Sequence, residues 1–237
     1  MAGFAVGFDV FVPKYVMSCV GLILANPGSD DASDTEETSH SLDEPVKALE
    51  LQGVTSDFHE WNQFLKENGV TVSDHSVCDS CLTREDALSR IWGLFRVFAQ
   101  TYLVIYLGHG RKGSGNCEMR DADVTLLDIE SAWLQLGYVR HLKNTATIVC
   151  DSCYSGKWPL FARSLQIPGL QIQSAVDGDT LARDSCPTFS HMFLQMQEGQ
   201  KFPEQFLHRW KPLCFSAAAD CTAGGPLHLV GAERTAS

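Results

Sequence analysis

The stretch YLVIYLGHG at residues 102–110 has a counterpart in TATIVCDSCYSG at residues 145–156. Each stretch begins as a near-continuous run of apolar and β-branched residues, a pattern typical of a strand buried on both faces of a parallel sheet. The first run ends at Gly108-His109-Gly110, and the second ends at Asp151-Ser152-Cys153. Two buried strands are therefore expected, each with reactive side chains just beyond its carboxyl end.

The rest of the chain alternates short apolar runs with segments of helical periodicity. This alternation predicts an α/β fold, a mostly parallel sheet with helices on both faces. Strands are expected at residues 20–25, 70–72, 102–107, 145–150, 170–176 and 227–230, and helices at 56–67, from the cap Thr83 to Phe98, at 128–136 and at 189–197. No internal repeat or clear linker is present, so a single domain over residues 1–237 is expected, with an acidic loop insertion at about 28–46.

Composition excludes several classes of function. The net charge of −11 argues against a nucleic-acid partner, which requires a basic face. No run approaches the ~20 apolar residues of a membrane span, and no basic segment precedes the first apolar stretch, so neither a membrane span nor a secretory signal is expected. The nine cysteines are odd in number and irregularly spaced, which favours free thiols in a reducing compartment, the cytoplasm.

His109 and Cys153 occupy the same kind of position, a few residues past a buried strand. The residues between them form one loop and one predicted helix, the size of a single crossover, so the two strands can be neighbours about 4.8 Å apart. An imidazole could then reach the thiol, assist thiolate formation and protonate a leaving amine. The backbone N–H groups of Gly110 and Cys153 would stabilise the oxyanion of such an acyl transfer.

The tripeptide Asp-Ser-Cys alone is weak evidence, because it occurs at residues 79–81, 151–153 and 184–186. Only the copy at 151–153 directly follows a buried strand. Cys78 and Cys81 have the spacing of a zinc knuckle, but no second pair of ligands stands at a suitable distance, so no metal site is expected.

Three segments resemble those of metacaspases, a family of caspase-like cysteine peptidases. Residues 106–110, YLGHG, resemble the family's YSGHG, and residues 151–156, DSCYSG, resemble its DSCHSG. Residues 51–57, LQGVTSD, are similar to its LRGCVND. The resemblance covers roughly residues 16–200 and implies a caspase–haemoglobinase fold, three layers around a mostly parallel, six-stranded sheet.

The resemblance also implies an endopeptidase with Cys153 as nucleophile and His109 as its acid/base partner. The family's matching aspartates line the pocket that selects Arg or Lys, and they correspond to Asp57 and Asp151. Two carboxylates facing one pocket would favour a cationic side chain through charge-assisted hydrogen bonds. The implied partners are protein or peptide substrates with basic residues, and the implied state is a monomer. Alternatively, Asp151 could cap a turn and Asp57 could favour a helix start.

Two departures of the sequence from the family bear on activity. Leu107 replaces the serine beside the histidine, and the acidic calcium-binding segment is reduced to scattered residues, namely Glu118, Asp121, Asp123 and Asp128. No cofactor is therefore expected, and calcium activation is doubtful. Both departures favour a rival interpretation, a catalytically silent caspase-fold scaffold that regulates an active partner. A third is a different doubly wound hydrolase that uses the same dyad on esters or amides.

Overall fold

The computed structural model describes residues 17–28, 51–138, 143–182, 187–197, 205, 210 and 212–216. The strand expected at 227–230 and nearly all of the acidic loop insertion lie outside these residues. None of the described helices combines the length and the apolar character that a membrane span requires.

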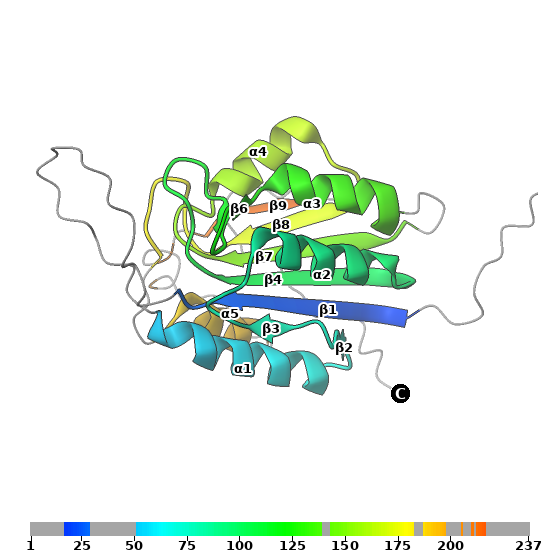
Figure 1. Ribbon diagram of the computed structural model, residues 1–237, viewed down its shortest axis with the longest axis horizontal. Helices are drawn as coiled ribbons and strands as arrows, with labels where there is room; N and C mark the ends of the chain where they lie inside the picture. Colours follow the sequence, from blue (N-terminus) through cyan, green and yellow to red (C-terminus); the bar gives the residue numbers. More distant parts are fainter. Residues whose placement is uncertain are drawn as a thin grey trace, which may run out of the picture.

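The central sheet follows the order β2-β1-β4-β7-β8-β9, and β3 also pairs with β1 (Figure 1). Its seven strands are β1 (Met17–Asn26), β2 (Thr71–Val72), β3 (Val77–Cys78), β4 (Ala99–Gly108), β7 (Thr145–Asp151), β8 (Leu170–Ser174) and β9 (Cys214–Ser216). Because β4 takes one edge of β1, the short β2 and β3 share the other edge, which leaves six strand positions. Among the described strands of this sheet only β9 is antiparallel to its neighbour, so the prediction of a mostly parallel sheet is confirmed, although the sheet has seven strands where six were expected.

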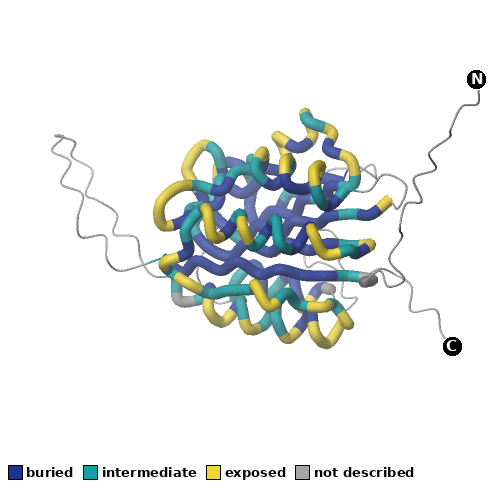
Figure 2. Tube along the Cα trace, turned by 45° about the vertical axis from the view of Figure 1, so that its right-hand side comes forward, coloured by how far each residue is buried: buried dark blue, intermediate teal, exposed yellow. Residues whose placement is uncertain are grey.

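Helices cover both faces of the sheet (Figure 1). One face carries α1 (Gln52–Glu67) and α5 (Phe189–Gln197). The other carries α2 (Arg84–Arg96), α3 (Leu126–Ala132) with the π-helical turn η1 (Trp133–Gly137), and α4 (Lys157–Leu165). The burial pattern follows these three layers, since the strands are buried while the outer sides of the helices are exposed (Figure 2).

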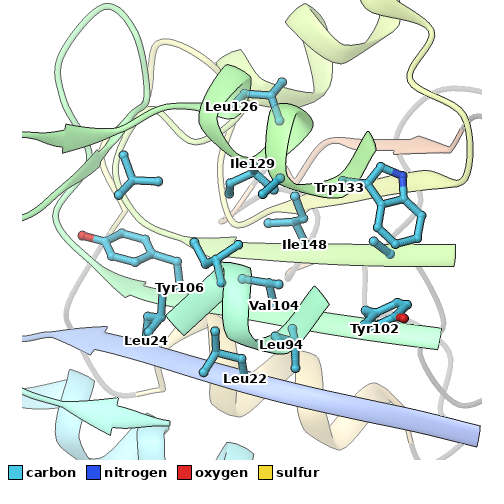
Figure 3. Packing of buried hydrophobic residues seen from close by; sticks show 14 of the residues in the cluster. Leu22, Leu24, Leu94, Tyr102, Val104, Tyr106, Leu126, Ile129, Trp133 and Ile148 are labelled. Carbon is cyan, nitrogen blue, oxygen red and sulfur yellow. The ribbon is translucent and has the colours of Figure 1, made fainter. Parts of the chain in front are cut away.

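Alternate residues of each strand enter two separate cores, as the period of a strand requires. Leu22 and Val104 pack under α2 and α3, where Figure 3 shows them beside Leu94 and Ile148. Their neighbour Ile23 instead packs under α1 and α5. Because both faces are apolar, β1 and β4 read as continuous apolar runs in the sequence.

Several helix boundaries differ from the expected ones for local reasons. Thr83 caps α2 by accepting the backbone N–H of Asp86, as predicted. The helix expected at 128–136 begins two residues earlier, because Thr125 and Asp128 form a reciprocal capping box, and it ends in η1. Helix α4 was not predicted; it tolerates Pro159 because its first turn needs no intrahelical N–H donor. Strand β9 and the hairpin of β5 (Cys117–Glu118) and β6 (Asp123–Val124) were also missed.

Candidate active site

The register of β4 and β7 brings the two candidate residues level. The strands are parallel neighbours, and their last paired residues are Leu107 and Asp151. His109 and Cys153 each lie two residues further along the chain. The expectation that one crossover joins two adjacent strands is therefore confirmed, and the two loops leave the same edge of the sheet at the same height.

Backbone contacts hold these two loops together. A Cβ atom placed on Gly110 would overlap the carbonyl oxygen of Cys153, and one placed on Gly115 would overlap that of Tyr154. Glycine is therefore required where the loop after β4 crosses the turn after β7. Within the described part of the chain, the N–H groups of Gly110 and Cys153, the predicted oxyanion donors, donate to no other residue.

The main chain of His109 is fixed, while its ring keeps a free nitrogen. The carbonyl oxygen of His109 accepts from the hydroxyl of Tyr106 at 2.8 Å and from the N–H of Glu118 at 3.1 Å. Its Nε2 atom is buried and has no hydrogen-bond partner among the described residues. A buried polar atom without a partner is costly, and such atoms are characteristic of functional sites.

The thiol of Cys153 is directed elsewhere. Its Sγ donates to the carbonyl oxygen of Ala182 at 3.7 Å. Burial raises the pKa of the Cys153 thiol above its ordinary value, and the nearby Asp151 carboxylate raises it further. The turn is held by the N–H of Tyr154, which donates to Thr180 at 2.9 Å, and Tyr154 itself has a φ of 57°, which non-glycine residues seldom adopt.

A narrow cavity joins the sulfur to both predicted pocket aspartates. Its volume is about 40 Å³, and its walls are Leu51, Val54, Asp57, Leu107, Gly108, Asp151, Cys153, Ala182 and Thr188. Leu107, the residue that departs from the family, is one of these walls and is itself buried. The structure thus brings Asp57, Asp151 and Cys153 into one cavity.

The start of α5 holds both carboxylates. The hydroxyl of Thr188 donates to Asp57 Oδ1 at 2.6 Å. The backbone N–H and the hydroxyl of Ser190 donate to Asp151 Oδ2 at 3.1 and 2.7 Å. Asp57 lies inside α1, five residues after its first residue, so it does not mark a helix start. Asp151 accepts hydrogen bonds from Ser190, which lies outside the turn that Asp151 was alternatively expected to cap.

Thr188 and Ser190 were missed by sequence reasoning. The available signal was a threonine directly before a predicted helix, which is usually a cap, and Thr188 does cap α5 by accepting the N–H of His191. The same hydroxyl reaches Asp57, 131 residues away in sequence. No local pattern indicates that second contact.

Of the four acidic residues that match the reduced calcium-binding segment, three form ion pairs with arginines and the fourth, Asp121, accepts a backbone N–H. Arg111 contacts Asp123 at 2.7 Å and Glu118 at 3.6 Å. Arg84 contacts Asp128 at 2.6 Å, and its backbone N–H donates to Asp121 at 2.7 Å. Across the described residues, no group of His, Cys, Asp and Glu side chains has the arrangement of a metal site.

No protein-family model matches this chain, and no curated protein matches it either. A solved structure does: caspase-1 from Spodoptera frugiperda superposes with a TM-score of 0.51 at 15% sequence identity, over 76% of this chain and 67% of that chain. The fold is caspase-like. At this identity the likeness concerns the fold, and the roles of individual residues depend on the site itself.

Proposed function

We propose that this chain is a metacaspase-like cysteine endopeptidase that cleaves peptide bonds after Arg or Lys, with Cys153 as nucleophile and His109 as acid/base. The main support is the shared cavity, in which a thiol and two carboxylates meet at the edge where the loops of β4 and β7 touch. A caspase-like fold is compatible with this chemistry, since ligands of open α/β sheets bind beyond the carboxyl ends of the strands.

The proposed reaction proceeds in two steps of acyl transfer. His109 takes the thiol proton, and the Cys153 thiolate attacks the peptide carbonyl carbon. The N–H groups of Gly110 and Cys153 donate to the resulting oxyanion. The imidazolium then gives its proton to the leaving amine, which departs as the new N-terminus. Water, deprotonated by His109, hydrolyses the acyl-enzyme and restores the thiol.

The proposed specificity follows from charge. Asp57 is buried and Asp151 is partly buried, and a buried carboxylate is stable only when hydrogen-bonded or paired with a cation. Thr188 and Ser190 orient the two carboxylates, and a guanidinium or ammonium group entering the cavity would add charge-assisted hydrogen bonds. A pocket of this kind selects Arg or Lys and rejects acidic side chains.

The described arrangement is a resting one under this proposal. A cavity of about 40 Å³ holds a few water molecules, whereas an arginine side chain needs more room. Ala182 lines the cavity, and its carbonyl oxygen accepts the hydrogen bond from the Cys153 thiol. Substrate entry therefore requires Ala182 to move, which would widen the pocket and free the sulfur for His109.

The remaining expectations stay part of the proposal. The enzyme acts without a cofactor under this proposal, since Asp128, Glu118 and Asp123 are already engaged in ion pairs with Arg84 and Arg111. It acts as a monomer on proteins or peptides with basic residues, with no nucleic acid or membrane. The cytoplasm is proposed as its location, and the seven described cysteines are all free.

A silent scaffold is the second candidate. The contact between Cys153 and Ala182 and the buried Leu107 in the cavity wall favour it. Hydrolysis of an arginine coumarinamide separates the two candidates. The wild-type protein should cleave it, Cys153→Ala should lower kcat/KM by at least about 1000-fold, and Cys81→Ala should not change it. Equal silence of the wild type and Cys153→Ala would contradict the peptidase and favour the scaffold.

A further inference from the structure

A bound peptide must leave Cys153 in two directions. The cavity with the carboxylates takes the side chain before the scissile bond, and its apolar walls Val54 and Leu107 belong to the core under α1 and α5. The chain after the scissile bond must therefore continue away from that face, across the loop that follows His109.

An open groove lies on the opposite face of the sheet. It has a volume of about 500 Å³, within the usual range for ligand sites. Its buried walls Leu126 and Trp158 belong to the core under α2 and α3. The groove and the carboxylate cavity are thus on opposite sides of the edge that carries Cys153.

The groove is built from the continuations of the two loops of the candidate dyad. One wall contains Gly113, Ser114 and Asn116, which begin four residues after His109, and the other begins at Lys157, four residues after Cys153. Gly115 rests on the carbonyl oxygen of Tyr154, so the two walls meet beside the nucleophile. The groove therefore lies beside the turn that carries Cys153.

The groove is also where exposed apolar side chains gather. Six large apolar residues are exposed in the described part of the chain, and three of them, Leu127, Leu160 and Phe161, line this groove. Such clustering marks interaction sites, whereas single exposed apolar residues are ordinary.

We infer that this groove binds the segment of the substrate that follows the scissile bond, and that it selects apolar residues there. The inference rests on the proposed peptidase function and extends it to a second specificity site. Substrates would carry a basic residue before the bond and apolar residues two to four positions after it. Ser114 and Asn116 also line the groove and carry polar atoms able to bond to peptide backbone.

The test compares three substrates with the same blocked segment ending in Arg. One is a coumarinamide without residues after the bond, and two are internally quenched peptides that continue with Ala-Leu-Phe-Leu or Ala-Ser-Gln-Ser. The wild type should prefer the apolar peptide by about tenfold in kcat/KM, the effect of partly burying apolar side chains. Leu127→Ser with Phe161→Ser should reduce this preference to about twofold and leave coumarinamide hydrolysis unchanged.

Leu134→Ser is the matched control, because Leu134 is similarly exposed but does not line the groove. This variant should prefer the apolar peptide as strongly as the wild type does. Leu160→Gln serves as a milder variant if the double variant fails to fold. A wild type that cleaves the coumarinamide but shows no apolar preference overturns the inference and leaves the peptidase intact. An unchanged preference in the groove variants also overturns the inference. So does a wild type that is a dimer and becomes a monomer in these variants, because the groove would then bind a second copy of the chain. A wild type that cleaves none of the substrates overturns the proposed function, and the inference with it.

Discussion

Cys-Asp-Ser-Cys occurs at residues 78–81 and again at residues 150–153, and both copies leave parallel strands of one sheet. The first copy follows β3, a two-residue strand at the edge. Its Asp79 is exposed and closes its own turn by accepting the N–H of Cys81 at 2.8 Å, and Cys81 is exposed. This copy therefore closes a local turn at the surface.

The second copy follows β7, which lies between β4 and β8 inside the sheet. Cys150 is fully buried, and Asp151 is held by Ser190. Cys153 shares a cavity with Asp151, and its carbonyl lies against Gly110 of the His109 loop. The comparison teaches that the position of the strand in the sheet decides whether this tetrapeptide closes a turn or builds a reactive site. Matched substitutions in the two copies test that conclusion.

The largest difference is expected at the aspartates. Asp151→Asn removes a charge from the cavity that the proposal assigns to Arg and Lys, whereas Asp79→Asn removes only a turn acceptor at the surface. Losing one partner of a buried charge pair costs about 3 kcal/mol or more, so kcat/KM for an arginine coumarinamide should fall roughly 100-fold in the first variant. It should change less than about twofold in the second. Equal losses would refute the assigned pocket.

A smaller effect is expected at Ser190, the residue of α5 that supports Asp151 of the second copy. Ser190 donates its hydroxyl to Asp151 and accepts the indole N–H of Trp61 at 2.9 Å, so Ser190→Ala leaves both groups short of a bond. A hydrogen bond to a charged group contributes about 1.5–3 kcal/mol, and kcat/KM should fall about tenfold, mainly through KM, with a lower Tm. Ser80→Ala in the first copy is the control and should behave as the wild type. An unchanged KM in Ser190→Ala would show that Asp151 needs no such support.

The smallest effect is expected from calcium. Arg111 pairs with two carboxylates of the hairpin beside the second copy, and Arg84 pairs with Asp128 of α3, so these carboxylates already have partners. Hydrolysis of the arginine coumarinamide should differ by less than about twofold between millimolar calcium and a chelator. Exposed ion pairs contribute little to stability, so calcium that weakens them should change the fold little. Activation beyond tenfold would mean that calcium displaces the arginines.

Much of this arrangement is readable from the sequence because the central strands are buried on both faces. Continuous apolar runs located β4 and β7, and one crossover between them predicted adjacency, which placed His109 and Cys153 at one edge. Helices α2 and α5 were located by a different signal, apolar residues that recur with a period of 3.6 residues after Thr83 and over residues 189–197.

The supporting contacts could not be predicted in this way. Thr188 reaches Asp57 across 131 residues, and the carbonyl of Ala182 carries no side-chain signal at all. The pairing of Arg84 with Asp128 joins two helices whose relative placement depends on the whole sheet. Such contacts are consequences of tertiary packing, whereas local patterns report only periodicity and turns.

The most direct test compares which cysteine reacts with two reagents, read by peptide mapping near neutral pH. Iodoacetamide should modify the exposed Cys81 first, because burial raises the pKa of Cys153 and its reaction accelerates only as the pH rises into the alkaline range. An acyloxymethylketone bearing arginine should reverse that order and label Cys153, and Asp151→Asn should abolish the label. The account would be contradicted if both reagents labelled Cys81 first, or if the acyloxymethylketone labelled Cys153 equally in the wild type and in Asp151→Asn.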